Sequence, residues 1–332
     1  MSTDTRNGLK VLDLSSNQIS IFKMKNPLPE NIEVLDLSYN NVSRVNNKSL
    51  PKNLKELYLF KNSFSERFRP RSPYPSTLEV LDLSYNSIYD FYPVSTLPIS
   101  LKTLNLKHNS LSSFKKKVPV SLTKLDLSIN RITDINDISL PSNLKELYLS
   151  NNTIFNNTFN NWVNFPETLE ILDMSNNVSR LSELNFELNF NPDKLPQLKE
   201  LYLSGNNIIS FNPKALPISI EILNLSDNNI RYFDSIDGSN VLVNNLPNLK
   251  VLDLSNNNLV DFNTYTDFLG RLNNINLIGI SGDALLSLLT AILNNVYTST
   301  PVMSITPYPD NYDISINISR LEQLGWVIKK GI

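Results

Sequence analysis

The chain has 332 residues, a hydrophobic content of 41% and a formal net charge of −2, so it can bury a sizeable core and has no overall attraction for nucleic acid or anionic membranes. It contains no cysteine, which excludes disulfides, thiolate metal sites and a cysteine nucleophile. The polar N-terminus and the lack of a long apolar stretch predict neither a signal peptide nor a membrane-inserted segment, so we expect an intracellular protein.

An eleven-residue pattern, L-x-x-L-x-L-x-x-N-x-I/L/V/F, recurs along most of the chain. Because so short a unit cannot bury its own apolar face, its copies must stack on one another as a solenoid. The pattern predicts a repeat array over residues 9–280, after a polar tail at 1–8. With the first apolar residue taken as position 1, eleven clear copies and a degenerate twelfth begin at Leu9, Ile32, Leu54, Leu78, Leu101, Leu122, Leu144, Leu169, Leu198, Ile220, Leu249 and Leu272.

Several positions of the pattern have a predicted structural role. Apolar residues at positions 4 and 6 predict a short strand with one inward face. Asn at position 9 can bond backbone groups where each coil turns, which predicts a ladder of stacked amides. Proline two or three residues before the strand in ten copies prevents a helix from entering it, so the far side of each coil is predicted to be extended, irregular or 3₁₀-like. Position 14 predicts an apolar spine made of Phe22, Val45, Phe91, Phe114, Ile135, Phe211, Phe233 and Phe262.

These in-register copies resemble the leucine-rich-repeat proteins. The LPxSL or LPxNL lead-in is similar to that of short-repeat effectors of Gram-negative pathogens and of repeats in some amoebae and their giant viruses. The resemblance implies an α/β-type repeat solenoid, shaped as a curved horseshoe with a concave parallel β-sheet that binds ligands and a mostly irregular or 3₁₀ convex side. The eighth copy departs from the pattern at Ser179, where an apolar residue is expected, and predicts a local irregularity.

The C-terminal residues 281–332 do not follow the pattern. A broad apolar face predicts a helix over 281–293, and VMSIT at 302–306 predicts a strand. A short helix over 319–325 and a strand over 326–330 complete the predicted elements. We interpret this α/β segment as a cap on the array rather than a separate functional module.

The N-terminal end of the array shows no comparable cap. An uncovered edge strand invites pairing, so either Met1–Gly8 folds over the first strand or a partner pairs with it. Longer steps between copies place extra residues at 155–168, 181–195 and 234–246, in loops of a kind that often bind partners. The aromatic tract that contains Trp162 is expected to pack rather than bind.

Position 2 alternates between Lys and Glu from one copy to the next, with a single neutral exception. Opposite charges on adjacent strands stabilise a sheet by roughly 0.2–1 kcal/mol each. The alternation therefore predicts a ladder of ion pairs that sets stability and register and binds no partner. Its members are Lys10, Glu33, Lys55, Glu79, Lys102, Thr123, Lys145, Glu170, Lys199, Glu221 and Lys250.

Positions 3, 5 and 8 form the predicted partner-binding surface. Positions 3 and 5 together carry six Asp and three Glu against one Lys, Lys124, a formal charge of −8 in a chain of net charge −2. Tyrosines, which are enriched at protein interfaces, are interspersed with the acids. The candidate residues are Asp13, Asp36, Tyr39, Glu56, Tyr58, Asp82, Tyr85, Asn105, Asp126, Glu146, Tyr148, Asp173, Glu200, Tyr202, Asn224 and Asp253.

The sequence offers little for catalysis. His108 is the only histidine, and the Ser residues near it recur at position 7 for structural reasons, so it is expected to be a surface residue without a catalytic role. There is no phosphate-binding motif, and Asp13 with Asp36 supplies too few oxygens for a calcium ion. The sequence therefore predicts no enzyme, no cofactor and no metal.

Two functions remain open. The first is an intracellular scaffold or effector-like protein, cytoplasmic in its own cell or in a host cell. Its acidic, Tyr-bearing concave face would bind a partner protein or peptide with a basic surface. The second is a structural or assembly component, such as a minor virion or surface protein, that docks through its uncapped N-terminal edge and its loops.

Overall fold

The computed structural model describes residues 8–70, 72–92, 97–115, 117–134, 138–154, 165–177, 186–188, 192–211, 216–233, 246–260, 272–280, 282–293, 301–305 and 314–330. The chain divides into two compact units, Met1–Ile154 and Phe155–Ile332. Most of the predicted loops 155–168, 181–195 and 234–246, together with Trp162, lie outside the described residues. The tail Met1–Asn7 and the predicted irregularity at Ser179 also lie outside them.

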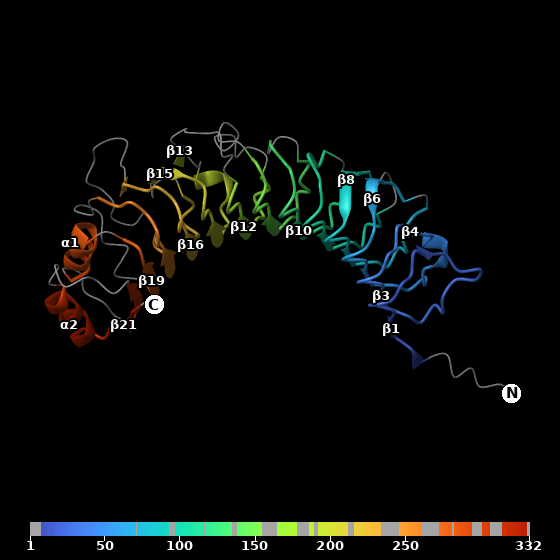
Figure 1. Cartoon of the computed structure of the whole chain (residues 1–332), viewed down its shortest axis with the longest axis horizontal. Coiled ribbons are helices and arrows are strands. Elements are labelled where there is room, and N and C mark those ends of the chain that lie inside the picture. The colour runs from blue at the N-terminus through green and yellow to red at the C-terminus, as the bar shows by residue number, and fades with distance from the viewer. Residues whose placement is uncertain are drawn as a thin grey trace. The chain divides into compact units, whose positions relative to one another are not determined.

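In the first unit, seven strands of the array lie side by side in parallel (Figure 1). Each strand consists of positions 3 to 5 of one copy, and equivalent positions of neighbouring copies face each other, as in the pair Leu35 and Leu57. The register follows directly from the sequence pattern. The strands are β1 (Val11–Asp13), β3 (Val34–Asp36), β5 (Glu56–Tyr58), β7 (Val80–Asp82), β9 (Thr103–Asn105), β10 (Lys124–Asp126) and β11 (Glu146–Tyr148).

The second unit also contains seven parallel strands of the main sheet. Five come from the copies, because the degenerate copy at Leu272 still supplies a strand. The last two belong to the segment interpreted as a cap, and they continue the sheet in parallel from β19. The strands are β12 (Ile171–Asp173), β14 (Glu200–Tyr202), β16 (Ile222–Asn224), β18 (Val251–Asp253), β19 (Asn274–Leu277), β20 (Val302–Ile305) and β21 (Val327–Lys330).

Two helices, α1 (Gly282–Leu293) and α2 (Ser315–Gln323), connect the last strands, and both were expected. The predicted bounds of the second helix, 319–325, were wrong. It starts earlier because Ile314 and Leu321 place buried apolar side chains two turns apart. It ends earlier because Gly325 adopts a left-handed φ of 92° and the Trp326 N–H bonds the Leu321 carbonyl at 3.0 Å.

The far side of the coils is largely extended. Short parallel ladders form there between β2 (Ile21–Phe22) and β4 (Arg44–Val45), between β6 (Ser65–Phe68) and β8 (Ser87–Phe91), and among β13 (Phe186–Leu188), β15 (Ile208–Phe211) and β17 (Tyr232–Phe233). Two 3₁₀ turns, Asn47–Ser49 and Pro192–Lys194, have all their residues within the described part of the chain. The expectation of a non-helical far side is confirmed, with more strand than the irregular or 3₁₀ description implied.

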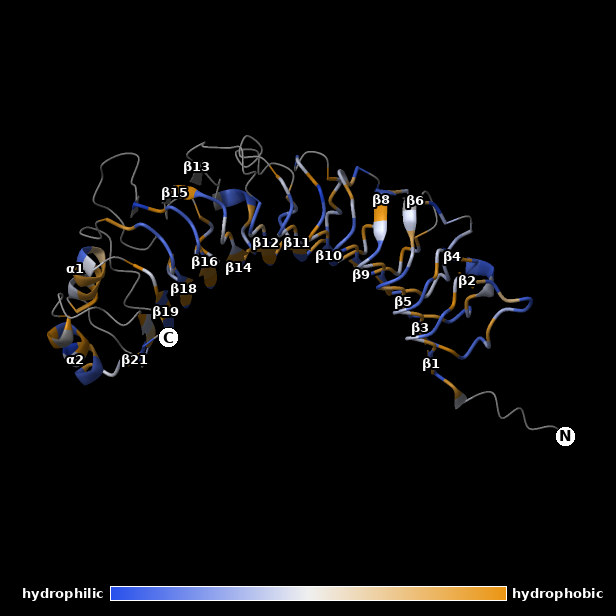
Figure 2. Cartoon of the chain, viewed as in Figure 1, coloured by the Kyte–Doolittle hydropathy of each residue, from blue (hydrophilic) through white to orange (hydrophobic). Residues whose placement is uncertain are grey.

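The core is a stack of equivalent apolar side chains. Figure 2 shows hydrophobic residues, in orange, recurring along the coils. Leu35, Leu57 and Leu81 at position 4 are fully buried, as are the Leu residues at position 6 beside them. The spine at position 14 is confirmed by Phe91 and Phe114, whose rings stack with centroids 5.8 Å apart. Phe22 is buried as predicted and Val45 is half-buried, whereas the side chains of Ile135, Phe211, Phe233 and Phe262 lie outside the described residues.

The predicted Asn ladder is confirmed. Asn86 donates from Nδ2 to the carbonyls of Leu83 at 2.9 Å, Ser84 at 3.0 Å and, one coil back, Leu59 at 3.1 Å. Its Oδ1 accepts the Phe64 N–H of the preceding coil at 3.1 Å. Each buried amide therefore bonds its own turn and the neighbouring one, which links successive coils through polar groups inside the core.

The backbone conformation at position 8 was not predicted. All twelve copies have a left-handed backbone there, with φ between 51° and 79°. This turn directs the position 8 N–H to the position 7 carbonyl of the next coil, as in Tyr39 to Phe60 at 3.1 Å. Bulky residues such as Ile129 therefore occupy a conformation that favours Gly, Asn and Asp. The repeat imposes this conformation whatever side chain the position carries.

A candidate partner-binding surface on the sheet

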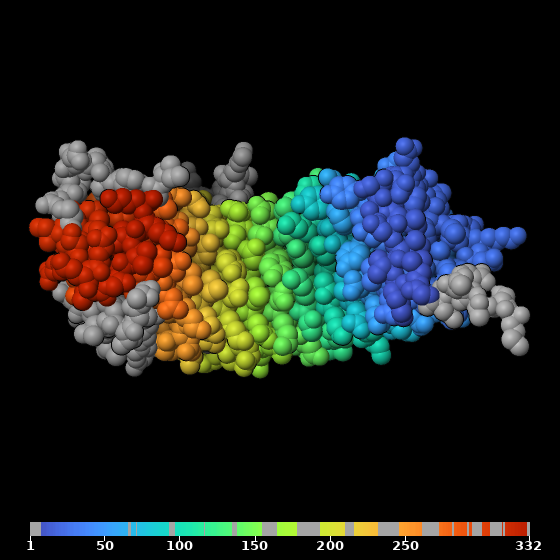
Figure 3. Space-filling view, turned by 90° about the horizontal axis from the view of Figure 1, so that it is seen from below, coloured from blue at the N-terminus to red at the C-terminus, as the bar shows by residue number. Residues whose placement is uncertain are grey.

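The candidate residues of positions 3 and 5 lie in columns along the outward face of the sheet, which is hereafter called the sheet face. In the first unit, Asp13 faces Asp36, Asp36 faces Tyr58 and Tyr58 faces Asp82, and the column continues through Asn105, Asp126 and Tyr148. In the second unit, Asp173, Tyr202, Asn224 and Asp253 follow one another. Figure 3 views the molecule from the side on which the strands lie.

The acids at position 5 also build the fold. Asp82 Oδ1 accepts the Ser84 N–H at 2.8 Å and the Ser84 hydroxyl at 2.6 Å, and Asp36, Asp126 and Asp253 make the same pair of bonds with the Ser two residues later. These bonds close the turn that follows each strand. One carboxylate oxygen is therefore committed to the turn.

The second oxygen of these acids is used unequally. Asp82 Oδ2 accepts from the Asn105 side chain at 3.0 Å, and Asp253 Oδ2 accepts from Asn276 at 3.0 Å. Within the described part of the chain, the second oxygens of Asp36 and Asp126 accept no hydrogen bond from the protein. These two oxygens can therefore accept from an external donor.

Each Tyr at position 5 is tied to the Glu two residues before it. Tyr58 donates to Glu56 at 2.7 Å, Tyr148 to Glu146 at 3.0 Å, and Tyr202 donates to Glu200 at 2.9 Å. Partial burial, with the Glu56 hydrogen bond as a second cause, raises the pKa of Tyr58 to about 12. These hydrogen bonds hold the three rings in place.

One stretch of the sheet face carries its own counter-charge. Lys124, the only base at position 3, contacts Glu146 at 2.6 Å, and its ammonium lies 5.1 Å from the centre of the Tyr148 ring. By contrast, positions 3 and 5 of β3, β5 and β7 include Asp36, Glu56 and Asp82 and no base. Together with Asp13 on the adjacent strand β1, these acids form a stretch in which positions 3 and 5 carry negative charge and no base.

Tyr39 and Tyr85 lie beside the sheet, on the left-handed turns, and are 48% and 41% exposed. The Tyr39 ring packs edge-on against Phe60 with centroids 4.9 Å apart, and the Lys61 ammonium lies 4.7 Å above it. Tyr85 stacks on His108 at 4.6 Å. His108 is exposed, as expected. Its ring adds to the exposed aromatic surface that Tyr39 and Tyr85 form beside the sheet.

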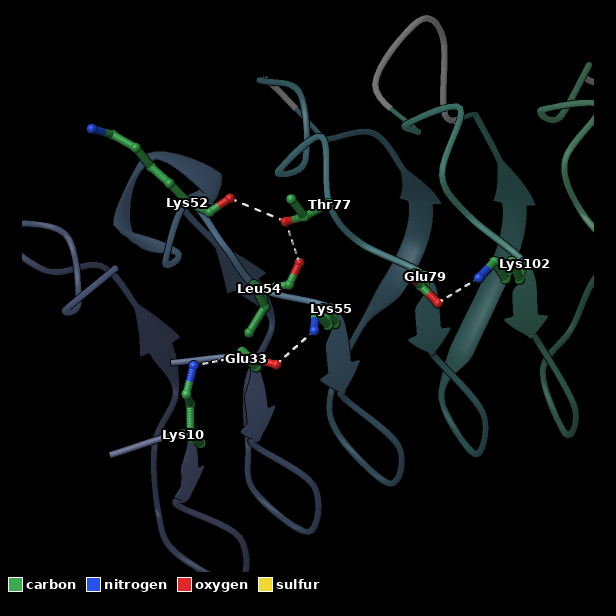
Figure 4. Close-up of polar contacts among 8 residues, drawn as sticks. All are labelled: Lys10, Glu33, Lys52, Leu54, Lys55, Thr77, Glu79 and Lys102. Atoms are coloured by element: carbon green, nitrogen blue, oxygen red, sulfur yellow. Dashed lines mark hydrogen bonds and ion pairs between the residues drawn. The ribbon is translucent and has the colours of Figure 1, made fainter. Parts of the chain in front are cut away.

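The ion pairs predicted for position 2 are present, and Figure 4 shows those of the first copies. Glu33 bonds Lys10 on one side and Lys55, at 2.7 Å, on the other, and these two hydrogen bonds lower the pKa of Glu33 to about 2. Glu79 pairs with Lys102 at 2.8 Å, and the same pairing recurs in the second unit between Glu221 and Lys250. These charges satisfy one another, as predicted.

A further ladder of hydrogen bonds between coils was not predicted from the sequence. The polar residue just before position 1 donates to the position 1 carbonyl of the preceding coil. Thr77 bonds Leu54 at 2.7 Å (Figure 4), and the same bond joins Ser100 to Leu78 at 2.7 Å and Ser121 to Leu101 at 2.8 Å. The Ser, Thr or Asn that recurs after the proline could have predicted this ladder. The repeated Asp-x-Ser could likewise have predicted that the position 5 acids bond the turn after each strand.

The described residues include no group of three or more potential metal ligands. Within that same part of the chain, no helix has the length and apolarity needed to cross a bilayer.

Stacked parallel strands with in-register apolar and Asn columns define the class of the chain as a parallel-strand repeat solenoid. Models described as Leucine Rich Repeat match residues 197–217 and 248–270, and further ones match 9–20 and 74–90. The chain is a leucine-rich-repeat protein.

Known proteins share this repeat. Toll-like receptor 2 of Macaca mulatta is 34% identical over 141 residues, which is 42% of this chain and 16% of the receptor. The chain thus matches about a sixth of the length of that relative. An internalin (inlF) of Listeria monocytogenes has the same fold, with a TM-score of 0.67, 18% identity and coverage of 97% of this chain and 87% of its own. The APL1 leucine-rich repeat domain gives a TM-score of 0.62 at 20% identity, covering 97% and 78%.

Proposed function

We propose that the chain is a non-enzymatic protein-interaction scaffold whose sheet face binds a basic segment of a partner protein. The observation that carries the proposal is the acidic stretch on β3, β5 and β7, where Asp36, Glu56 and Asp82 surround Tyr58 with no base at positions 3 or 5. Electrostatic complementarity of this kind selects a partner and speeds its association.

The geometry suits a Lys or Arg side chain laid over Tyr58. Asp36 and Asp82 flank Tyr58 on the two adjacent strands, so their backbones are about 10 Å apart, twice the strand spacing. A cation over the ring would be attracted by its face and by both carboxylates. Because Glu56 holds the Tyr58 hydroxyl, little ordering is required on binding.

Relatives support the general class of function. One solved structure with this fold is a complex of Latrophilin 3, Unc5D and the leucine-rich repeat protein FLRT2, with a TM-score of 0.55, and another is the LRIM1/APL1C complex, with a TM-score of 0.52. Leucine-rich repeats commonly mediate protein–protein interaction, and the acidic sheet face is the surface on which we place it here.

The test uses a charge change that spares the fold. Asp36→Asn with Asp82→Asn keeps a side-chain oxygen for each turn and removes two charges. Glu167→Gln with Glu322→Gln removes two exposed charges elsewhere and serves as the matched control. The probe is a fluorescent peptide with alternating Arg and Val, titrated at low and high salt and followed by anisotropy.

We expect the first double variant to weaken binding roughly tenfold, since each lost charge pair contributes up to about 1 kcal/mol, and the control to leave binding unchanged. High salt should weaken wild-type binding and reduce the difference between the proteins. Binding that ignores both salt and the double substitution would show that the sheet face does not recognise basic segments.

A further inference from the structure

The first unit contains nearly the same pair of strands twice, once with a cation of its own and once without. The strands β10 (Lys124–Asp126) and β11 (Glu146–Tyr148) read KLD and ELY and face each other in register. The strands β3 (Val34–Asp36) and β5 (Glu56–Tyr58) read VLD and ELY and face each other in the same register. The two pairs differ only at position 3 of the first strand, where one has Lys and the other has Val.

Lys124 shows how such a pair of strands holds a cation. Its ammonium contacts Glu146 Oε2 at 2.6 Å, and the Tyr148 hydroxyl donates to the same oxygen at 3.0 Å. The ammonium also lies 5.1 Å from the centre of the Tyr148 ring, which is within the range of a cation–π contact. One ammonium is therefore held by a carboxylate and by a ring that the same carboxylate positions.

The equivalent acceptors on β5 are arranged in the same way but have no cation. The Tyr58 hydroxyl donates to Glu56 Oε2 at 2.7 Å, and the residue that faces Glu56 on β3 is the uncharged Val34. Lys55, the base next to Glu56 in the chain, is paired with Glu33 at 2.7 Å. Within the described part of the chain, Glu56 forms no ion pair.

The surroundings of Tyr58 increase the attraction for a cation. On its other side Glu56 faces Val80, so neither adjacent strand supplies a base at position 3. Asp36 and Asp82 flank Tyr58 at position 5, and the second carboxylate oxygen of Asp36 accepts no hydrogen bond from the described residues. The acids that hold Lys124 in one pair of strands are thus present in the other without a counter-charge.

We infer that Glu56 and Tyr58 form a subsite for the ammonium of one Lys side chain of the partner, placed on β5 as Lys124 is placed on β11. The inference rests on the proposed function and identifies one contact within it. A Lys ammonium suits the subsite because it is a compact charge that can share a carboxylate oxygen with the Tyr hydroxyl. The aliphatic stem of the incoming side chain would cover Val34. The equivalent subsite on β11 is closed to a partner because Lys124 fills it.

Replacement of Val34 tests whether the subsite can be closed. Val34→Lys gives β3 and β5 the sequence of β10 and β11, so the introduced ammonium should fill the subsite and weaken binding of a basic peptide roughly tenfold. Val34→Met adds a side chain of similar length without the charge. Val251→Lys adds the same charge on a strand that faces Ile222 and Asn274 and no carboxylate at position 3. Both controls should bind like wild type. The probe is a fluorescent peptide with alternating Lys and Ser, followed by anisotropy in the full chain.

Lys124→Val makes the opposite change and should open a second subsite. NMR signals of isotope-labelled tyrosine rings locate the bound peptide. In the wild-type chain the peptide should shift the signals of Tyr58 and leave those of Tyr148 in place, and in Lys124→Val it should shift both. Spectra without peptide test the geometry alone, because in Val34→Lys the Tyr58 signals should move toward those of Tyr148.

The outcomes separate this inference from the function on which it rests. Binding that depends on Asp36 and Asp82 but stays as tight in Val34→Lys as in wild type overturns the subsite and leaves the acidic face as the binding surface. A Tyr148 signal that responds to peptide in the wild-type chain also overturns the subsite alone. If Val34→Lys does not fold, Lys124→Val decides, and an unchanged Tyr148 signal there overturns the inference. A wild-type chain that binds no basic peptide contradicts the proposed function and the subsite together.

Discussion

Removal of one amide from the Asn ladder should destabilise the fold far less than its number of hydrogen bonds suggests. Asn130 makes four buried bonds: to the carbonyls of Leu106 at 3.0 Å, Leu127 at 3.0 Å and Ser128 at 3.2 Å, and from the Leu111 N–H at 2.9 Å. If every partner were left unsatisfied, Asn130→Ala would cost well above about 4 kcal/mol, at 1–3 kcal/mol for each buried group.

The ladder supplies a second donor to each of those carbonyls. Leu106 also accepts from Asn109 at 3.0 Å, Leu127 from Asn152 at 3.0 Å, and Ser128 from the His108 N–H at 2.9 Å. Only the Leu111 N–H loses its sole partner. We therefore expect Asn130→Ala to cost about 2 kcal/mol, the penalty for one buried unsatisfied donor with a small cavity.

Two further variants sharpen this prediction. Asn130→Asp keeps the acceptor for Leu111 but sets a carboxylate oxygen against three carbonyls, so it should destabilise more than Ala does. Asn17→Ala, at the same position of the first copy, removes an exposed side chain that bonds only the carbonyls of Leu14 and Ser15, and it should cost under about 1 kcal/mol.

Hydrogen exchange measured by mass spectrometry suits these variants because repeat arrays can open locally. Peptides that contain Leu111 should lose protection in Asn130→Ala while those around Asn17 keep it. A loss of stability in Asn130→Ala as large as the cost of four unsatisfied buried groups would refute the idea that the ladder is redundant. A loss of stability in Asn17→Ala equal to that in Asn130→Ala would refute it as well.

Three more predictions concern single positions. Gly279→Ala should lower stability by about 1–2 kcal/mol in thermal melts, because φ is 79° and the added Cβ would lie 3.2 Å from backbone atoms of Asn256. At Gly205, where φ is 66°, the close contacts are to the Asn176 side chain and the Asn176 Cα is 3.7 Å away, so Gly205→Ala should cost less. Ile129→Asn should raise stability by about 1 kcal/mol in the same melts, because Asn tolerates the left-handed φ of 53° better than a β-branched residue does. The lowered pKa of Glu33 means that its carboxylate stabilises the fold above its ordinary pKa of 4.5, and this contribution disappears as pH falls toward about 2. Glu33→Gln should reduce that part of the acid dependence in pH-dependent melts, and an unchanged acid transition would contradict the prediction.

The sequence predicted most of the fold because each coil repeats the same few contacts. Period, register, the Asn ladder and the Lys–Glu ladder all follow from columns of equal residues. The left-handed turn at position 8 had a signal in only half of the copies. Tyr39, Lys61, His108 and Ile129 obey no turn preference, and there the bonds between coils impose the conformation. In the last six copies, by contrast, the position carries residues that favour a left-handed backbone, namely Asn151, Asn176, Gly205, Asp227, Asn256 and Gly279.

The helices and strands of the cap were predicted, but their pairing with the repeat sheet was not. Helices and strands over 281–330 follow from local apolar periodicity, whereas their pairing with the repeat sheet depends on contacts far apart in the chain. The end of α2 likewise depends on the left-handed Gly325. Local patterns therefore located the elements, and packing determined that they continue the sheet.

The candidate binding residues combine two tasks, and this limits how they can be tested. Asp36 holds its turn through one oxygen and offers the other outward, so Asp36→Ala would remove a structural bond together with the charge. Loss of binding in such a variant would not distinguish recognition from local distortion. Asn at position 5 already occurs naturally, and Asn105 accepts the Lys107 N–H at 3.0 Å just as the acids accept theirs. The array therefore shows that Asp→Asn preserves the turn, so a change in binding on that substitution reports the charge itself.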